Sequence, residues 1–209
     1  MAASAKIAGA VVAALVPLSL ALPATATAQE RAAEAPDPAC VSRPDCRFVG
    51  PVTLRTDHGV VTPALNRNMP FLRTNNGGQR LWLVIGERVE FRLGGPGELP
   101  LIILGHGLAS DPEKSKAELT DKIEVDFAQL PNSTYTVMTV HNGLGRSLQY
   151  KAFMLTRSGE EKPTSACAVL PGISSFESWP GPLLEIELAD FQLTDIQQNT
   201  AGSMTVSCK

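Results

Sequence analysis

Three histidines stand beside turn residues, and neutral imidazole is a common ligand of copper and zinc in proteins. A glycine follows each of His58, His106 and His141 within two residues, which places each histidine at the end of an expected strand. Loops gather at the two ends of a β-sandwich, so histidines at strand ends could converge there. Spacing along the chain does not decide whether they meet. We keep a copper or zinc site at these three residues as a hypothesis and otherwise expect no cofactor.

The segment LPLIILGHG, residues 99–107, predicts a buried strand followed by His-Gly, and it resembles the oxyanion-hole strand of the α/β-hydrolases. That resemblance implies acyl transfer, which in this family requires a nucleophile elbow of the form G-x-S-x-G. The chain contains no such motif. A core strand that ends in a glycine-flanked turn is the simpler interpretation, and the sequence assigns no catalytic residue. A hydrolase without a recognised motif remains as an alternative.

Two pairs of carboxylates are spaced two residues apart, so each pair points to one face of an expected strand. These pairs are Glu124 with Asp126 and Glu185 with Glu187. Each pair alternates with large apolar residues, and this pattern predicts a sheet face turned toward solvent. Acid–base catalysis or calcium binding would need a cleft, which the pattern does not predict.

Two tryptophans differ in their surroundings. Trp179 opens a Trp-Pro-Gly-Pro segment and is a candidate binding-surface residue that could stack on a sugar or a peptide, although covering one open end of the fold is the simpler role. Trp82 lies in the most apolar stretch of the chain and is expected in the core. Asn132-Ser133-Thr134 matches a glycosylation acceptor, a match that is common by chance.

Four cysteines form an even set, which is typical of disulfides in an oxidising compartment. Three pairings are possible. We favour Cys40 with Cys46, where the intervening residues can turn the chain, and Cys167 with Cys208, which would fasten the last strand to the body. The spacing contains no C-x2-C pair, which disfavours zinc ligation by cysteine.

The first 28 residues have the three parts of a secretory signal peptide in the required order. Lys6 supplies the positive charge, an apolar run covers residues 7–22, and Ala26-Thr27-Ala28 predicts cleavage before Gln29. The run is shorter than the roughly 20 residues that cross a bilayer. We therefore expect an exported protein, periplasmic or secreted, with no membrane span after signal removal.

Residues 29–39 are rich in alanine, glutamate and proline and predict a flexible leader. The remaining stretch, 40–209, has no fixed-period repeat and no linker, so we expect a single domain. The net charge of the chain is −3, and no basic stripe with interleaved aromatic residues is present. The sequence therefore does not predict a nucleic-acid-binding protein.

Period-two alternation predicts about nine strands. The run 81–85 is apolar on both faces, and Gly86-Glu87 joins it to an alternating strand over 88–93 as an expected hairpin. Another strand is expected over 101–104. A meander is expected over 119–157, with strands around 123–127, 135–140 and 148–155, and further strands around 184–188 and 204–208. One short helix is expected at 111–119, with Asp111 as its N-cap.

Many short strands and almost no helix predict an all-β fold, an immunoglobulin-like or jelly-roll β-sandwich. The Cys-Trp-Cys pattern of true immunoglobulin domains is absent. With no catalytic motif, the leading functional hypothesis is a non-enzymatic binding or structural module of the cell envelope. Its partner would be an envelope protein or surface component. The alternatives are the metal-binding protein and the hydrolase described above.

Overall fold

The computed structural model describes residues 40, 45–63, 65, 67–75, 78–94, 101–109, 120–156 and 160–195, all within one compact unit of the chain. This part of the chain forms fourteen strands and no α-helix. The strands are β1 (Cys46–Val49), β2 (Leu54–Thr56), β3 (Gly59–Val61), β4 (Arg67–Pro70), β5 (Leu72–Asn75), β6 (Gly78–Val84), β7 (Glu87–Leu93), β8 (Leu101–Leu108), β9 (Ile123–Gln129), β10 (Thr136–Asn142), β11 (Ser147–Leu155), β12 (Glu161–Thr164), β13 (Ser174–Trp179) and β14 (Glu185–Thr194).

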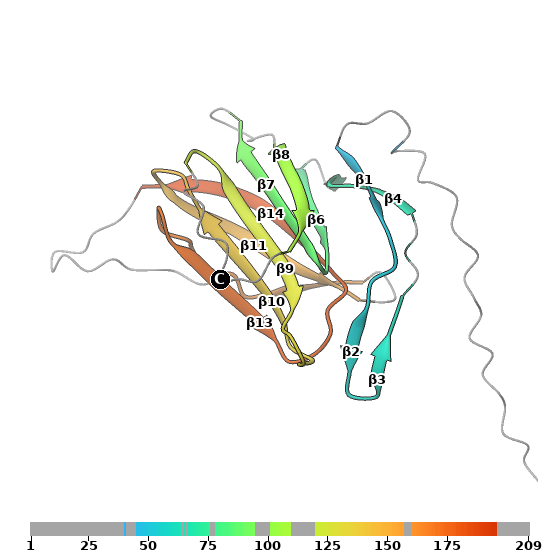
Figure 1. Ribbon diagram of the computed structural model, residues 1–209. Coiled ribbons are helices and arrows are strands. Elements are labelled where there is room, and N and C mark those ends of the chain that lie inside the picture. Colours follow the sequence, from blue (N-terminus) through green and yellow to red (C-terminus); the bar gives the residue numbers. More distant parts are fainter. Residues whose placement is uncertain are drawn as a thin grey trace, which may run out of the picture. The chain divides into compact units, whose positions relative to one another are not determined.

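Two five-stranded antiparallel sheets form the body of the fold (Figure 1). The strand order in the first sheet is β13-β10-β9-β7-β8, and in the second it is β12-β11-β14-β6-β5. Two further pairs, β1 with β4 and β2 with β3, are short two-stranded ribbons. The expected all-β sandwich is therefore confirmed.

The main core lies between the two sheets and is built by the alternation that the sequence displays. Val89 and Phe91 on β7 and Val125 and Phe127 on β9 are fully buried, while the residues between them face away from the core. The second sheet contributes apolar side chains from β6, β11 and β14 to the same cluster. Burying a large apolar side chain stabilises the fold by about 1.5–3 kcal/mol, so these rows fix which face of each strand points inward.

Strand β6 is apolar on both faces because both of its faces are covered. Leu81 and Leu83 face the main core, whereas Trp82 and Val84 pack with Val49 and Met69 in a second small cluster. The ribbon of β1 and β4 therefore covers the outer face of the second sheet at β6. Trp82 is 3% exposed, as expected for a core residue.

The prediction that residues 81–93 form a β-hairpin is wrong, because the two strands do not pair with each other. Strands β6 and β7 both exist and the turn between them contains Gly86, with φ of +91°, but the two strands belong to different sheets. The meander breaks in the same way, since β9 pairs with β10 whereas β11 lies in the second sheet. Turn residues reverse the chain direction equally well within a sheet and between sheets, so the sequence pattern did not separate the two cases.

The number of strands differs from the prediction, and some predicted elements lie outside the described residues. Nine strands is too few, because short strands such as β2, β3 and β12 carry little alternation. Residues 1–39, with the predicted signal peptide and leader, lie outside the described residues, as do the helix at 111–119 and the strand at 204–208. No helix in the described ranges is long and apolar enough to span a membrane.

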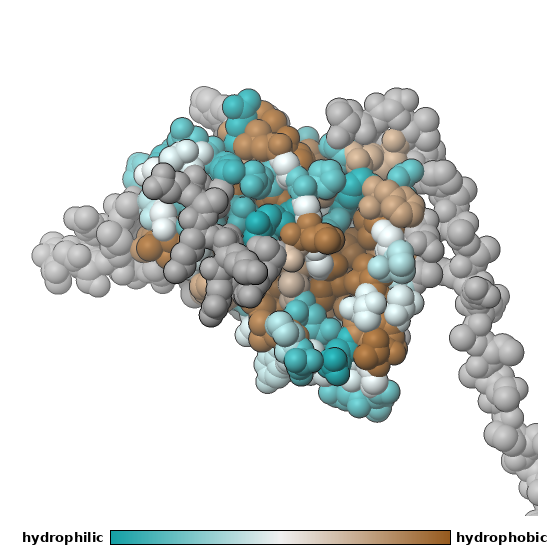
Figure 2. Space-filling view, in the orientation of Figure 1, coloured by the Kyte–Doolittle hydropathy of each residue, from teal (hydrophilic) through white to brown (hydrophobic). Residues whose placement is uncertain are grey.

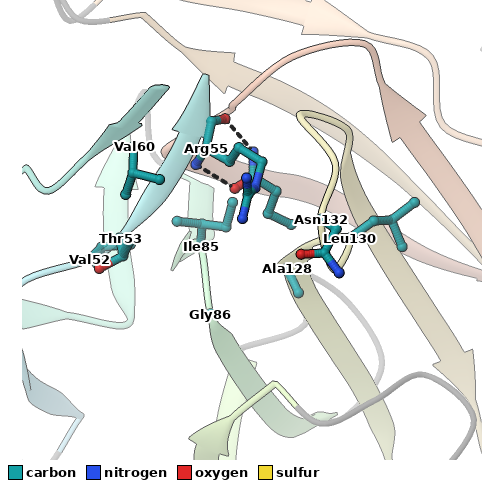
Figure 3. Close-up of a pocket in the computed structure, with 10 residues that line it drawn as sticks. Val52, Thr53, Arg55, Val60, Ile85, Gly86, Ala128, Leu130 and Asn132 are labelled. Atoms are coloured by element: carbon teal, nitrogen blue, oxygen red, sulfur yellow. Dashed lines mark hydrogen bonds between the residues drawn. The ribbon is translucent and has the colours of Figure 1, made fainter. Parts of the chain in front are cut away.

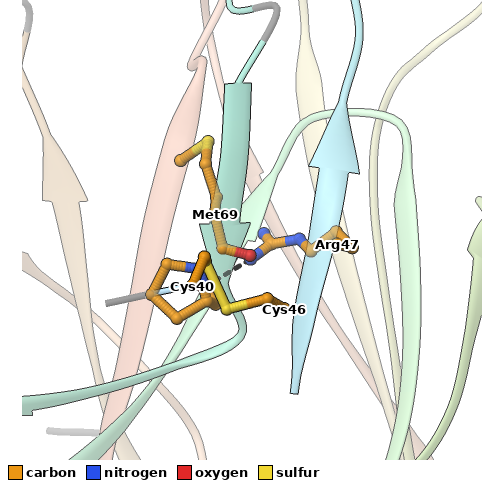
Figure 4. Close-up of a disulfide and its surroundings, with 5 residues drawn as sticks. Cys40, Cys46, Arg47 and Met69 are labelled. Carbon is orange, nitrogen blue, oxygen red and sulfur yellow. Dashed lines mark hydrogen bonds between the residues drawn. A yellow bond between two sulfur atoms is a disulfide. The ribbon is translucent and has the colours of Figure 1, made fainter. Parts of the chain in front are cut away.

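Arg47 fastens the β1–β4 ribbon to both sheets. Its guanidinium donates to both carboxylate oxygens of Glu87 on β7, at 2.7 Å each, and to the backbone carbonyl of Trp82 on β6, at 3.0 Å. It also donates to the carbonyls of Met69 (Figure 4) and Pro70 on β4. The Cys40–Cys46 disulfide, with a Cα–Cα distance of 5.5 Å, closes the chain just before this arginine.

Candidate functional site

The β2–β3 hairpin stands at one end of the sandwich and is anchored in the core mainly by Leu54, with Val61 packed against the same cluster. Leu54 is 3% exposed and belongs to the main apolar cluster. The turn of the hairpin is shaped by the Thr56 hydroxyl, which accepts the His58 N–H at 3.2 Å and donates to the Gly59 carbonyl at 2.9 Å. Gly59 has φ of +117°, a conformation that favours glycine.

The Gln129 side chain ties this hairpin to the first sheet in the manner of a neighbouring strand. Its amide oxygen accepts the backbone N–H of Arg55 at 2.8 Å, and its amide nitrogen donates to the Arg55 carbonyl at 2.7 Å. The same nitrogen lies 3.2 Å from the carbonyl of Thr134, in the turn between β9 and β10. A side-chain amide can pair with a backbone peptide group because it carries the same donor and acceptor.

A pocket of about 340 Å³ lies between the hairpin, the β6–β7 turn and the end of β9 (Figure 3). The hairpin side contributes Val52, Thr53, Arg55 and Val60, and the body contributes Ile85, Gly86, Ala128, Gln129, Leu130 and Asn132. The Gly86 N–H donates to the Phe127 carbonyl at 2.7 Å, which fixes the β6–β7 turn against β9. The walls of the pocket are therefore held by hydrogen bonds from both sides.

Two apolar side chains of the pocket are exposed although they have the character of core residues. Val60 is 59% exposed and Leu130 is 38% exposed, whereas Ile85 is 4% exposed. Figure 2 shows apolar surface on the side of the molecule where Figure 1 places β1, β2 and β3. Apolar surface that lines a concave site and is accompanied by a few polar groups is typical of ligand and partner binding sites.

The polar groups of the pocket determine what chemistry it can recognise. Arg55 is exposed and brings a permanently charged guanidinium, and Asn132 brings an exposed side-chain amide. The Gln129 amide is already occupied by the backbone of Arg55 and Thr134. The pocket thus suits an apolar group that carries an acidic or hydrogen-bond-accepting group beside it.

The three histidines do not form a shared metal site. His106 and His141 lie on β8 and β10 with β7 and β9 between them, and at about 4.8 Å per strand spacing their backbones are about 14 Å apart. His106 faces the core side, with its ring 5.0 Å from that of Phe71, whereas His141 faces outward. His58 lies in the β2–β3 turn. Within the described ranges, no group of three or more His, Cys, Asp or Glu could hold a metal ion.

His141 instead lies in a cross-strand row on the outer face of the first sheet. Its Nδ1 is 2.8 Å from the Ser174 hydroxyl on β13, and Glu124 on β9 is its neighbour on the other side. Glu124 is 3% exposed and lies 3.8 Å from the guanidinium of Arg88. Asp126 is 6% exposed and accepts two hydrogen bonds from the same guanidinium, at 2.9 and 3.2 Å. The prediction that Glu124 and Asp126 face solvent is therefore wrong, because both carboxylates are covered.

In the second carboxylate pair Glu187 is buried and Glu185 is partly buried, so this pair is not turned toward solvent either. Glu187 is 1% exposed, and its two oxygens lie 2.8 Å from Arg73 and 3.1 Å from Arg80. Glu185 accepts the indole N–H of Trp82 at 3.0 Å. Burial raises the pKa of Glu185, and this effect exceeds the opposing influence of Trp82 and three nearby arginines. Both carboxylates hold neighbouring strands together.

Trp179 is the last residue of β13 and packs against the main core. Its ring meets that of Phe127 edge-on at 6.4 Å, and its N–H donates to the Thr164 hydroxyl at 2.9 Å. This placement matches the role of covering an end of the core more closely than that of a ligand contact. Cys167 is disulfide-bonded, but the expected partner Cys208 lies outside the described residues, so that pairing stays a prediction.

The sequence did not point to the pocket, although one signal was available. Arg55, Val60 and Leu130 lie in three separate stretches with no shared motif. The available signal was Val60-Val61 directly after Gly59. It predicts a short apolar hairpin strand whose packing partner the sequence does not identify. Comparison with models of known protein families, with curated proteins and with solved structures found no match to this chain.

Proposed function

We propose that this chain is a non-enzymatic binding module that acts outside the cytoplasm, as a periplasmic or secreted protein. Its partner would be a protein or another component of the cell envelope. The binding surface would be the pocket between the β2–β3 hairpin and the first sheet. The expected signal peptide and the Cys40–Cys46 disulfide support the location, because disulfides persist in oxidising compartments.

The observation that carries this proposal is the exposed apolar wall of an otherwise well-anchored pocket. Val60 is 59% exposed, while the hairpin beneath it is held by Leu54 and by the Gln129 amide. At this exposure Val60 buries little apolar surface within the hairpin. A group that covers Val60 and Leu130 would bury apolar surface at about 25 cal/mol per Å².

A site-specific photocross-linking experiment tests the proposal. A photoreactive p-benzoylphenylalanine replaces Val60 in one variant and Phe176 in a matched control, since Phe176 is also exposed but lies on β13, outside the pocket. The exported form is irradiated in its native envelope. We expect a defined adduct from position 60 that Leu130→Asp abolishes. An adduct only from position 176, or the same adducts from both positions, would overturn the proposal.

One observation favours a second candidate, a hydrolase that uses the outer row of the first sheet. Ser174, His141 and Glu124 are residue types that serve as nucleophile, general base and the carboxylate that orients the base, and the first two lie within 2.8 Å. Hydrolysis of a generic ester that disappears in both Ser174→Ala and His141→Ala would support it. Unchanged hydrolysis in Ser174→Ala would exclude this row as its site.

A further inference from the structure

The four outer strands of the two sheets differ in how their free edges are protected. Natural sheets block edge-to-edge pairing with short strands, proline, charged residues or inward-pointing charges. Strand β12 has the sequence EKPT, and β5 has only four residues, among them Arg73. Strand β13 carries Glu177, which points inward and accepts the Cys167 N–H at 3.2 Å. Each of these three edges therefore has at least one protective feature.

Strand β8 has none of these four features. It is eight residues long, has the sequence LIILGHGL without a charged residue or a proline, and pairs only with β7 among the described strands. Ile102, Leu104 and Leu108 on this strand are 37%, 48% and 86% exposed. A bulge opposite the Glu90–Phe91 step is its one irregularity. An exposed, uncharged edge of this length is a template for a further strand.

The backbone groups that face the free edge follow from two hydrogen bonds. Ala109 donates its N–H to the Gly86 carbonyl beside β7, so by alternation the peptide groups of His106 and Leu108 face away from β7. At the other end, Leu101 donates its N–H to the Gln79 side chain and not to β7, so Leu101 and Ile103 also face the free edge. Because Gln79 already accepts the Leu101 N–H, residues 102–107 are the part of the β8 edge that is available for pairing with a further strand.

We propose that β8 pairs antiparallel with β8 of a second copy of this chain, joining the two first sheets into one continuous sheet. The two-fold axis would pass between Leu104 and Gly105. This register places Ile103 opposite the second copy's His106, and both residues present their peptide groups to the free edge, as an antiparallel hydrogen-bonded pair requires.

The same register matches large side chains with glycines. Ile102 falls opposite the second copy's Gly107, and Leu104 falls opposite the second copy's Gly105. Ile102 and Gly107 pair with Arg92 and Arg88 of β7, so both lie on the outer face of the sheet. The space above Gly107 is open, and above Gly105 only the Glu90 side chain approaches, at 3.6 Å. The strand is therefore complementary to itself, and this complementarity argues for a second copy as the occupant.

Sedimentation equilibrium of the exported form over a range of concentrations tests the proposal. We expect concentration-dependent association toward twice the monomer mass, since a single strand pair makes an interface below the roughly 1,200 Å² of stable complexes. Hydrogen exchange at Ile103 and His106, whose N–H groups face the free edge, should slow as the concentration rises. His106→Pro removes an N–H that faces the free edge and leaves the bonds to β7 intact, so it should abolish association.

Leu104→Lys is the second variant, because it places like charges from both copies beside the two-fold axis at a position that is already half exposed. Phe176→Lys on β13 is the matched control and should associate like the wild type. Circular dichroism and thermal unfolding establish that each variant is folded. A wild type that stays monomeric up to about 1 mM, roughly a thousandfold above a micromolar Kd, would overturn the proposal. Loss of association in Phe176→Lys to the same extent as in Leu104→Lys would overturn it too.

Discussion

The two carboxylates of β14, one buried and one partly buried, differ in how well their charge is compensated. Glu187 lies between two guanidinium groups, those of Arg73 and Arg80, at 2.8 and 3.1 Å. Glu185 has the Trp82 N–H as its hydrogen-bond donor, and burial raises its pKa. The two residues are two positions apart on one strand and one face, yet the charge of Glu187 is paired whereas the cost of burying the charge of Glu185 is only partly compensated.

Glu185→Gln should therefore stabilise the protein at neutral and alkaline pH. The folded-state pKa of Glu185 is raised above its ordinary value of 4.5, so its favourable contribution is complete below pH 4.5 and is lost as the pH rises through the folded-state pKa. Glutamine keeps an oxygen that accepts the Trp82 N–H. We expect the Tm difference between variant and wild type to vanish below pH 4.5 and to grow as the pH rises.

Glu187→Gln is the matched comparison, with the opposite expected sign. It leaves the guanidinium groups of Arg73 and Arg80 without their shared carboxylate, and because Arg73 is partly exposed we expect a loss of about 2 kcal/mol. Urea unfolding at pH 7 measures both variants. If Glu185→Gln were destabilised as much as Glu187→Gln, the charges of the two carboxylates would be equally well compensated, and this interpretation would be wrong.

Arg47 is the single residue on which the β1–β4 ribbon most depends. Arg47→Ala leaves the Glu87 carboxylate without its bidentate partner and removes donors to Met69, Pro70 and Trp82. Breaking a buried ion pair costs about 3 kcal/mol. Arg47→Lys keeps the charge but not the two-pronged geometry, so an intermediate loss is expected in the same urea unfolding experiment. A loss below about 0.5 kcal/mol in Arg47→Ala would show that the ribbon is held mainly by apolar packing.

At the scale of elements, alternation along the chain predicted which strands exist and which faces are buried. The rows of Val89 with Phe91 and of Val125 with Phe127 are fully buried, as their spacing indicated. The partners of strands could not be predicted in the same way. Leu81–Ile85 is apolar on both faces because a ribbon from residues 46–70 covers one of them, and only the fold brings that ribbon there.

The carboxylate pairs illustrate why burial of polar residues was missed. Alternation with apolar residues assigns Glu124 and Glu187 correctly to the face opposite the main core. It carries no information on whether arginines from other strands cover that face. Arg88 and Arg80 do so here, at distances that only the strand order sets. The pocket was missed for the same reason, since its walls come from three separate segments.

At the scale of elements, the Gln129 side chain holds the β2–β3 hairpin through the kind of backbone hydrogen bonds that a neighbouring strand would make. In Gln129→Ala the Arg55 N–H loses its acceptor, and since one hydrogen bond contributes about 1 kcal/mol, its amide exchange should accelerate about fivefold. Gln129→Glu keeps the acceptor and loses the donor, so exchange at Arg55 should stay near the wild-type rate. Amide exchange followed by NMR measures both, and equal rates in Gln129→Ala and wild type would contradict the tether.

At the scale of the whole molecule, the Cys40–Cys46 disulfide closes a short loop at the start of β1. In the chain-entropy model a loop of this length stabilises the fold by about 2 kcal/mol. The double variant Cys40→Ala, Cys46→Ala should lose this amount of stability in urea unfolding. A reducing agent should cost the wild type the same contribution, which the double variant has already lost. An unchanged midpoint in the double variant would contradict the contribution.

Export and folding are coupled if the first 28 residues act as we propose. Expressed from Met1 in a bacterial host, the chain should be recovered outside the cytoplasm with Gln29 as its first residue, as read from intact mass. Leu15→Asp places a charge within the apolar run and should leave the precursor uncleaved. The retained precursor would meet cytosolic reductants, so alkylation should find free thiols at Cys40 and Cys46 only in this variant. Cleaved protein from Leu15→Asp would contradict the signal-peptide assignment, whereas an uncleaved precursor that carries the disulfide would separate the disulfide from the export route.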